Sequence, residues 1–363
     1  MRCRVGAAIF RREGHEVREG GHLLDAGAPH DRLVRALSRD APLTDVSLVV
    51  FVTRRFAVAI SLLLIISFGV YSLVHIAPGD PVRSLLGARA SDPATLAAIR
   101  ARYHLDDPFL VQYGKWLSQV IRGDLGVSIQ GNRAVASVIA DRLGVTIFLS
   151  MMSTILVLGL GIPLGAVAAL RRGTPLDRAV VMFGVFGISS PAFVTGIFLL
   201  YVFGVLLHWF PIFGPGRGFL GRAWHLSLPA LALAISVMAI VVKITRAAMI
   251  EELARDYVTF ARARGLSSRR ILLAYVLRNS LIPVVTAAGL IVVGIVAGAI
   301  YVEATFSLPG LGALTLDAIQ KRDIPTIQGT TLLFSAFVVL VNLAVDVIYT
   351  LIDPRIRFGR IES

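Results

Sequence analysis

The sequence has very little of the chemistry that enzymes and metalloproteins use. It contains one cysteine, Cys3, so it forms no internal disulfide, and its seven histidines are scattered rather than grouped at metal-ligand spacing. Only three lysines occur, and none completes the pattern G-x-x-x-x-G-K-[ST] that cradles the phosphates of ATP. The motifs H-E-x-x-H, C-x-x-C and G-x-S-x-G do not occur either. We therefore expect no enzyme, no metal site and no ATPase site in this chain.

Charged residues are also scarce, at 16% of the chain against 56% hydrophobic residues, whereas soluble domains carry about a quarter. Apolar runs of about 20 residues recur, which is the length that crosses a bilayer as a helix. Backbone groups in lipid must pair within their own segment, and the runs do not alternate as barrel strands do. The sequence therefore predicts an all-α polytopic membrane protein with six transmembrane helices; counts of five or seven fit the loop charges less well. The predicted spans are Phe56–Ile76, Val145–Leu170, Ala179–Leu207, Leu228–Ile250, Leu281–Val302 and Thr330–Ile352.

The formal net charge of +13 would indicate nucleic-acid binding in a soluble protein. Here the basic residues follow the membrane topology, because cytoplasmic loops collect Lys and Arg. Fourteen basic residues lie in the segments assigned to one side and four in the short segments assigned to the other. We therefore expect both termini in the cytoplasm, contact with membrane lipid, and no nucleic acid.

The organisation along the chain follows from these spans. Residues 1–50 form a polar tail that we expect to be disordered, unless translation starts near Val46–Val52. Residues 51–76 hold the first transmembrane helix, and residues 77–143 form an outer segment of short helices. Residues 144–353 form a core of five helices with a cytoplasmic loop at 251–280, and residues 354–363 form a cytoplasmic tail.

The loop holds the densest arginine cluster of the chain, RDYVTFARARGLSSRRILLAYVLRNSLIP. Its first half, Glu251–Arg264, predicts a helix that stops at Gly265, because glycine accepts the left-handed conformation. Ser267 can cap a second helix at Ser268–Asn279. Aromatic side chains beside guanidinium groups are typical of a docking surface. The alternatives are a basic segment lying on anionic lipid, and charge that only fixes the topology.

Four stretches, in order, resemble one family. They are TRRFAVAISLLLIISFGVYSLVHIAPGDPV, YHLDDPFLVQYGKWLSQVIRGDLGVSI, DYVTFARARGLSSRRILLAYVLRNSLIPVVT and NLAVDVIYTLIDPRIR, and together they cover most of residues 53–357. They are similar to the permease subunits of bacterial ABC importers of the dipeptide, oligopeptide and nickel group. The resemblance implies the type I ABC importer permease fold, in the bacterial plasma (inner) membrane.

The resemblance also implies partners: a second homologous permease subunit, two ATP-binding subunits or domains that use ATP and Mg, and an extracytoplasmic substrate-binding protein. The first helix of the loop would dock into an ATPase subunit, as the coupling helix. The wider superfamily often reads Glu-Ala-Ala before the glycine, whereas this chain has Thr259-Phe260-Ala261, so arginines are candidates for the polar contact. The predicted docking residues are Tyr257, Phe260, Ala261, Arg262, Arg264, Gly265 and Leu266.

Polar residues inside the spans are candidates for the translocation path. Asn342, Asp346, Tyr349 and Asp353 share one face of the last span, and an ionisable residue in a span faces protein or water. The alternative for Asp346 is a hydrogen bond to a neighbouring helix. Ser189, Ser190 and Pro191 interrupt the third span, as a hinge or pore wall or as an ordinary packed kink.

Three further charged residues lie near the ends of the predicted spans. We expect Lys243 and Arg246 to extend to the membrane surface. We expect Glu303, at the outer end of the fifth span, to contact lipid headgroups or the partner subunit.

The sequence thus predicts a permease subunit that translocates di- or oligopeptides or related small solutes by alternating access, powered by separate ATPase subunits. The alternatives are a secondary transporter driven by an ion gradient and a membrane scaffold that transports nothing. Dipeptides, oligopeptides, nickel complexes and glutathione-like solutes all remain candidate substrates.

Overall fold

The computed structural model describes residues 43–76 and 107–352. The chain divides into two units, Met1–Val50 and Phe51–Ser363, and the packing below is that of the second unit. The predicted short helix in SDPATLAAIRARYHL lies outside the described residues, as do Asp353 and the tail 354–363. The helices are α2 (Leu43–Ile76), α5 (Phe109–Ile121), α6 (Val135–Leu170), α7 (Pro175–Ser189), α8 (Ala192–Leu199), η2 (Leu200–Leu206), α9 (Gly218–His225), α10 (Ser227–Leu253), α11 (Asp256–Ala263), α12 (Ser268–Arg270), η3 (Ile271–Val276), α13 (Leu277–Thr305), α14 (Leu311–Gln320) and α15 (Ile324–Ile352).

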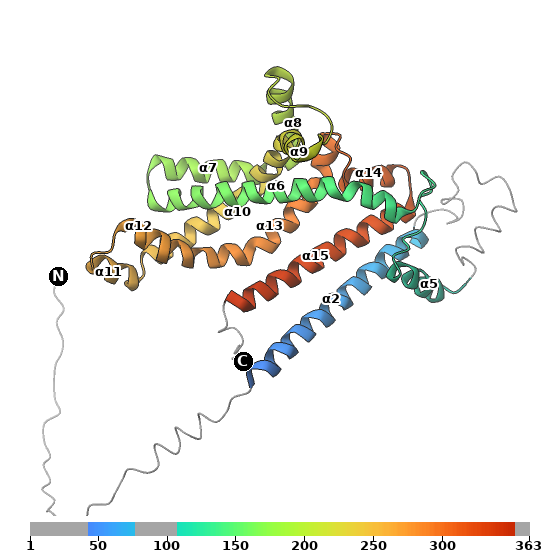
Figure 1. Cartoon of the computed structure of the whole chain (residues 1–363), viewed down its shortest axis with the longest axis horizontal. Helices are drawn as coiled ribbons and strands as arrows, with labels where there is room; N and C mark the ends of the chain where they lie inside the picture. The colour runs from blue at the N-terminus through green and yellow to red at the C-terminus, as the bar shows by residue number, and fades with distance from the viewer. Residues whose placement is uncertain (1–42, 77–106, 353–363) are drawn as a thin grey trace, which may run out of the picture. The chain divides into compact units, whose positions relative to one another are not determined.

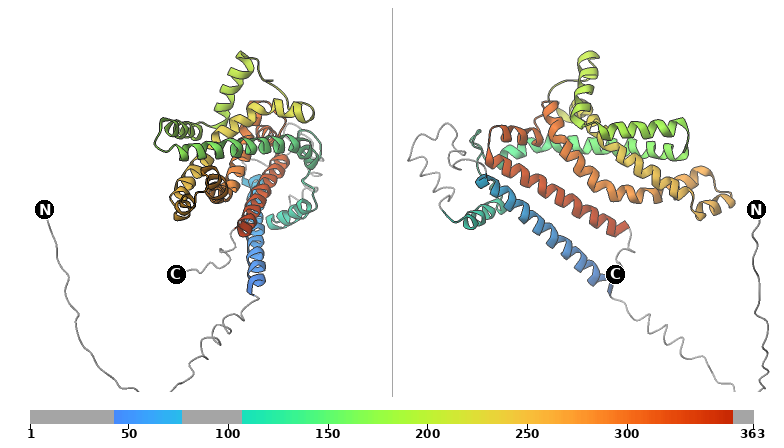
Figure 2. Two further views of the ribbon diagram at one scale, coloured as in Figure 1. Left: turned by 60° about the vertical axis from the view of Figure 1, so that its left-hand side comes forward. Right: turned by 180° about the vertical axis from the view of Figure 1, so that it is seen from behind.

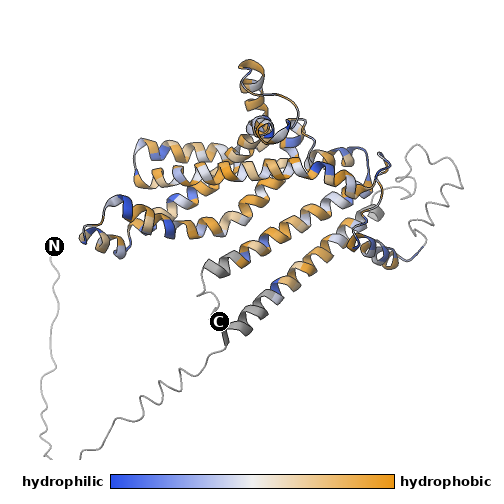
Figure 3. Cartoon of the chain, in the orientation of Figure 1, coloured by the Kyte–Doolittle hydropathy of each residue, from blue (hydrophilic) through white to orange (hydrophobic). Residues whose placement is uncertain are grey.

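The prediction of a helical membrane protein is confirmed. In the part of the chain that the structure describes, five helices are long and apolar enough to cross a membrane, and a sixth span results if the bent pair α7 and α8–η2 counts as one. Within the described residues the extended structure is limited to one isolated bridge between Val127 and Ala134. Hydrophobic residues cover the long helices, and hydrophilic residues gather around α11 and α12 (Figure 3).

Several helices are longer than the hydropathy pattern predicts. α6 begins at Val135 instead of Val145, α15 begins at Ile324 instead of Thr330, and α2 begins at Leu43, inside the predicted polar tail. Two short helices were missed altogether: α9 and α14 lie where the sequence predicts only loops. The hydropathy pattern locates only the apolar part of a helix. The helix itself continues for as long as its backbone N–H and C=O groups pair, whether the residues at its ends are polar or apolar.

α10 is the central helix of the bundle. It packs against α6, α7, α8 and α13 (Figures 1 and 2). In its most apolar stretch 61% of the residues are buried, the highest share among the five single-helix spans. Leu233 and Val241 of α10 contribute to one core cluster with Leu149 of α6 and Ile295 of α13. Lipid is as apolar as these side chains, so tight packing rather than the hydrophobic effect holds the helices together.

The most extensive helix–helix contact is between α6 and α10, and glycines let the two helices approach closely. Gly161 and Gly165 are four residues apart on α6, the small-xxx-small spacing that brings two transmembrane backbones together. A Cβ on Gly161 would lie 3.1 Å from Val241, and one on Gly165 would lie 2.8 Å from the Val242 carbonyl oxygen. The two helices can therefore approach this closely only because these side chains are absent.

The third predicted span is broken. α7 ends at Ser189, α8 starts at Ala192, and the two helices meet at 105° (Figure 1). Ser190 has φ −98° and ψ 117°, the extended conformation that a following proline imposes. Its carbonyl oxygen, which no longer joins the helix ladder, accepts a hydrogen bond from Ser236 Oγ of α10 at 3.3 Å. The sequence predicted this interruption, but as one interrupted span and not as two helices at this angle.

The predicted outer stretch FLVQYGKWLSQVI forms α5, which packs on α2 through aromatic rings and hydrogen bonds. Ser67 Oγ and Tyr113 Oη lie 2.8 Å apart, and Tyr71 Oη donates to Gln112 Oε1 at 3.1 Å. The rings of Phe68 and Tyr113 meet edge to face with their centroids 5.3 Å apart. Such aromatic pairs add stability beyond their buried area.

We predict opposite effects for two alanine substitutions on α6. Gly165→Ala places a methyl group against the α10 backbone and lowers the free energy of unfolding by about 1–3 kcal/mol, the usual range for overpacking. Gly159→Ala has no atom within 4 Å of the added Cβ, so it leaves stability unchanged or raises it by about 0.5–1 kcal/mol through helix propensity. Thermal unfolding of the purified chain in detergent measures both. Equal Tm values for the two variants would contradict the close contact.

Candidate functional site

The arginine-rich loop folds as a short helix closed by a glycine turn. α10 ends at Leu253, and α11 begins at Asp256 after Arg255, which is extended. Gly265 has φ +75°, its N–H donates to the Arg262 carbonyl at 2.9 Å, and the Leu266 N–H donates to the Ala261 carbonyl at 3.2 Å. This pair of bonds is the Schellman motif, which needs a left-handed residue at the glycine position. The predicted stop at Gly265 is confirmed.

The predicted second helix, Ser268–Asn279, is not a separate element. α12, η3 and α13 form one helical run from Ser268 to Thr305, and Pro283 lies inside it. Ser267 precedes this run, but its side chain makes no capping hydrogen bond. The prediction was wrong because Pro283 was taken as a boundary, although transmembrane helices tolerate proline when neighbours satisfy the freed group. α11 is thus joined by a four-residue turn to a helix that continues through the span.

α11 buries one face and exposes the other. Val258 and Ala261 are buried in a small cluster with Met249 of α10 and Ile271 of η3, and Leu266 packs on it. Phe260 is 69% exposed, and Arg262 and Arg264 are exposed as well. Of the predicted docking residues, Phe260, Arg262 and Arg264 therefore share the free surface. Ala261 faces inward, so the prediction that it contacts a partner directly does not fit its position.

Tyr257, another predicted docking residue, joins α11 to α10 and α13 by hydrogen bonds. Its hydroxyl donates to the Glu252 carboxylate at the end of α10 and accepts from Asn279 Nδ2 of α13 at 3.3 Å. Burial, and then the hydrogen bond to Glu252, raise the pKa of Tyr257 above its ordinary value, so the hydroxyl remains a donor. Glu252 and Asn279 were missed by the sequence analysis, because the helix breaks between Glu252 and Tyr257 and no periodicity relates them.

The candidate path residues contact different helices of the bundle. Ser189, Ser190 and Pro191 form the bend that contacts α10. Asp346 of α15 instead forms an ion pair with Arg55 of α2 at 2.5 Å, which matches the alternative of a bond to a neighbouring helix. Asn342 is exposed one turn earlier on α15, while the side chain of Tyr349 lies outside the described residues.

Glu303, near the end of α13, is fully buried beside the first residues of α14. Its carboxylate accepts from Thr146 Oγ1 of α6 at 2.6 Å and from the backbone N–H groups of Gly312 and Ala313 at 2.8 and 3.2 Å. Thr146 in turn accepts from the Leu311 N–H at 2.8 Å. The expectation that Glu303 contacts lipid headgroups or a partner was wrong, because α14, which was not predicted, covers it. A carboxylate at a helix N-terminus satisfies amides that would otherwise lack partners.

Arg246 is also paired within the bundle rather than extended to the surface. Its Nε and Nη2 atoms donate to the two carboxylate oxygens of Asp177 at 2.6 and 2.9 Å, and the Gly173 N–H donates to the same carboxylate at 2.9 Å. The expectation for Arg246 was therefore wrong, whereas Lys243 is exposed, and its extension to the membrane surface stays a prediction. This bidentate pair fixes the first turn of α7 on α10.

Comparison with known proteins identifies the class to which these features belong. Residues 161–358 match the family described as binding-protein-dependent transport system inner membrane component, and residues 48–150 match the N-terminal model of the same kind of protein. The chain belongs to this family. It is a multi-pass protein of the bacterial inner membrane and a permease subunit of an ABC importer, which confirms the resemblance carried by the four sequence stretches.

Two relatives and one solved structure show how similar the chain is to individual proteins. The chain is 38% identical to a protein of Brucella suis biovar 1 named as a peptide permease, over 84% of this chain and 97% of the relative. It is 39% identical to the glutathione transport system permease protein GsiC of Escherichia coli K12, over 85% of this chain and 99% of the relative. A chain of the MetNI methionine ABC transporter, in an inward-facing conformation, has the same fold: the TM-score is 0.50 at 18% identity, covering 60% of this chain and 96% of that one.

We predict that Tyr257→Phe loosens α11. The variant leaves the Glu252 carboxylate without its phenol donor, and a hydrogen bond to a charged group contributes about 1.5–3 kcal/mol. Local opening of α11 should therefore rise at least about tenfold. The rate of trypsin cleavage after Arg262 and Arg264 in the detergent-solubilised protein measures the opening. The control is Tyr275→Phe on η3, a more exposed tyrosine; equal cleavage of the two variants would contradict the bracing role.

Proposed function

We propose that this chain translocates peptides, including glutathione-like peptides, by alternating access, and that separate ATPase subunits drive it by docking on α11. The relatives named for peptide and glutathione transport support the substrate class. The observation that carries the docking proposal is the two-sidedness of α11: Val258 and Ala261 hold it to the bundle, while Phe260 presents an exposed aromatic ring.

The proposed orientation places α11 and both termini in the cytoplasm. The basic residues of the α6–α7 turn and of α11–α12 support this, because cytoplasmic loops collect arginine and lysine. ATP and Mg then belong to the partner ATPase subunits and this chain binds no cofactor of its own. A second, homologous permease subunit completes the path, and a substrate-binding protein delivers solute on the opposite side.

The docking surface would consist of Phe260, Arg262 and Arg264 around the turn at Gly265. Burying a phenylalanine side chain contributes about 1.5–3 kcal/mol, and arginine and aromatic residues are typical anchors of interfaces. The two arginines are the candidates for the polar contact that glutamate makes in other importers. Tyr257, Ala261 and Leu266 would support this surface from behind rather than touch the partner.

A force on α11 would reach the membrane-spanning helices through two connections. One is the buried cluster and the Tyr257–Glu252 hydrogen bond, which join α11 to the end of α10. The other is the short turn into the helical run Ser268–Thr305. A movement of α11 would therefore displace α10 and α13 together, the two helices that share the core cluster.

The bend at Ser189, Ser190 and Pro191 is the proposed hinge of the path. A hydrogen bond from Ser236 to the Ser190 carbonyl holds the bend on α10, next to the close backbone contact between Gly187 and Ile235. We assign Asn342 to the path wall as well. Asp346 would act mainly through Arg55, because its charge is already compensated in this conformation.

Substitutions in the docking surface should separate assembly from insertion. Phe260→Asp places a charge in the interface, and Gly265→Pro demands φ near −65° where the turn has +75°. Both variants should remain in the membrane but lose the co-purifying ATPase subunit and at least 90% of uptake, a rough expectation for a lost hot spot of about 2 kcal/mol. The control for assembly is Phe213→Asp, whose ring is 72% exposed in the loop before α9. Normal ATPase recovery with Phe260→Asp would refute the docking proposal.

The energy source is tested on the reconstituted transporter. Proteoliposomes holding this chain, its partner subunits and the binding protein should accumulate peptide when ATP is enclosed on the ATPase side. Accumulation should persist when an ionophore collapses ion gradients, because the work comes from nucleotide. Uptake by this chain alone along an imposed ion gradient would instead establish a secondary transporter.

A further inference from the structure

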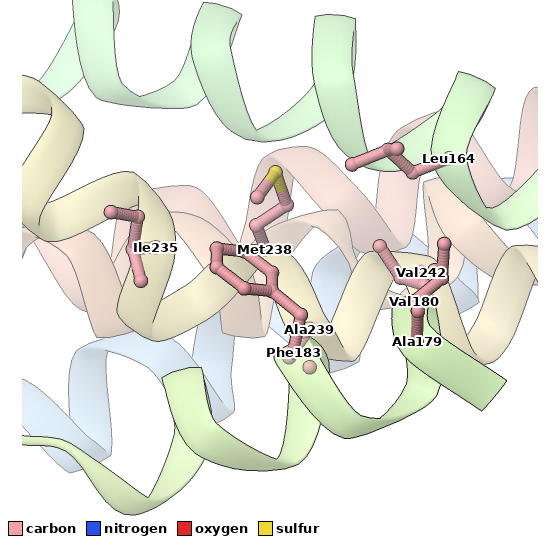
Figure 4. A pocket seen from close by; sticks show the side chains of 9 residues that line it. Leu164, Ala179, Val180, Phe183, Ile235, Met238, Ala239 and Val242 are labelled. Atoms are coloured by element: carbon pink, nitrogen blue, oxygen red, sulfur yellow. The ribbon is translucent and has the colours of Figure 1, made fainter. Parts of the chain in front are cut away.

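An apolar pocket of about 320 Å³ lies between α6, α7 and α10. Figure 4 shows the side chains of Leu164, Phe183 and Met238, one from each helix, around the same space. Ala179 and Phe183 are exposed at its edge, so the pocket opens to the surface of the bundle. Its complete lining is Leu164, Ala179, Val180, Phe183, Gly184, Ile235, Met238, Ala239 and Val242.

The chemistry of this lining selects a hydrocarbon. All nine residues have apolar side chains or none, and they lie within helices whose ladders pair the backbone amides. Small residues keep the space open: a Cβ on Gly184 would already lie 3.4 Å from that of Ala239. From Ala179 to Gly184 the pocket follows α7 for about 8 Å, at the helical rise of 1.5 Å per residue. A polar solute gains no hydrogen bond there, whereas a segment of an alkyl chain matches the polarity of the lining.

One end of the pocket carries a cluster of positive charges. Arg171, Arg172 and Arg178 are exposed around the α6–α7 turn, and Arg178 immediately precedes the pocket residue Ala179. Lys243 is exposed on α10 four residues after Ala239, so it extends from the same face of that helix.

The acid in the first turn of α7 is already ion-paired with an arginine outside this cluster. Asp177 is buried and engaged by both nitrogens of Arg246 and by the Gly173 N–H. Within residues 53–72 and 107–347, whose side chains the structure describes, the cluster's four basic side chains form no ion pair. An apolar slot that ends in uncompensated cations therefore matches a molecule with an alkyl chain and an anionic head.

We propose that this site binds an anionic phospholipid, with one acyl chain between α6, α7 and α10 and its phosphate at the basic cluster. The charge decides against a second copy of this chain, whose net charge is +13, and against zwitterionic lipid, which brings no net negative charge. The bound lipid braces α7 on the side of the bundle before the bend at Ser190. None of the pocket residues belongs to the proposed substrate path or to the docking surface on α11.

The test is lipid retention by the assembled transporter. The complex is purified from nanodiscs holding equal amounts of phosphatidylglycerol and phosphatidylcholine, and the lipids that stay bound are counted by native mass spectrometry. Phosphatidylglycerol should be retained at least about fivefold over phosphatidylcholine. Each basic residue near a membrane surface contributes about fivefold to anionic-lipid binding, so Arg178→Gln with Lys243→Gln should lower the ratio about 25-fold, or to unity where the ratio is smaller than that. Arg269→Gln with Arg270→Gln on α12 removes the same charge elsewhere and should leave it unchanged.

A second pair of variants tests the acyl slot without changing charge. Ala179→Phe fills the mouth of the pocket and should remove the retained phosphatidylglycerol, whereas Ala297→Phe, on an exposed position of α13, should not. Equal retention of the two lipids by the unmodified complex overturns the proposal, as does retention that neither the charge nor the pocket variant alters. An Ala179→Cys chain, with Cys3→Ser, that cross-links to another permease subunit would also overturn it, because protein would then cover the pocket.

Discussion

The contact on which the rest of the structure depends is the close approach of α10 to α6 and α7. In lipid no hydrophobic driving force gathers helices, so van der Waals contact and a few polar bonds must do so. Gly161 and Gly165 let α6 reach the α10 backbone, and a Cβ on Gly187 of α7 would be 2.6 Å from the Ile235 carbonyl oxygen. The Asp177–Arg246 pair then fixes the same neighbours at one end of the bundle. α10 is thereby the axis of the bundle, and a displacement of α10 would carry α6 and α7 with it.

The proposed coupling apparatus is built at the end of this axis. α11 follows α10 after two residues, packs back on Met249, and hydrogen-bonds through Tyr257 to the last turn of α10. It continues through a glycine turn into the run that includes α13, which shares a core cluster with α10. An element held this way can transmit a displacement without unfolding, because its inward contacts are apolar and its outward ring is free to engage another protein.

The length of the apolar runs was sufficient to predict the spans, Pro191 to predict the bend, and Gly265 to predict the end of α11. It could not predict α14 or the burial of Glu303, because the carboxylate is satisfied by Thr146 and by amides more than eight residues away in sequence. Arg246 was misassigned for the same reason, since its partner Asp177 is on another helix. For the loop, composition located the arginines and Phe260, but which face of α11 is buried depends on Met249 and Ile271, a tertiary contact that local spacing does not contain. Long-range pairing of polar groups is therefore the part that one sequence leaves open.

The enclosure of Glu303 has a practical consequence for protein engineering. There is no room for a side chain at Gly310 or Gly312 beside the Glu303 carboxylate. The backbone N–H groups of Gly312 and Ala313 donate hydrogen bonds to that carboxylate. The stretch from Glu303 to Ala313 is therefore a closely packed segment held by its own hydrogen bonds, although hydropathy alone would mark it as a loop between two spans. Epitope tags, fluorophores or fused domains inserted there would interrupt it. The exposed turn at Phe213 and Gly214, where an added Cβ on Gly214 would meet no atom within 4 Å, is a more permissive insertion point.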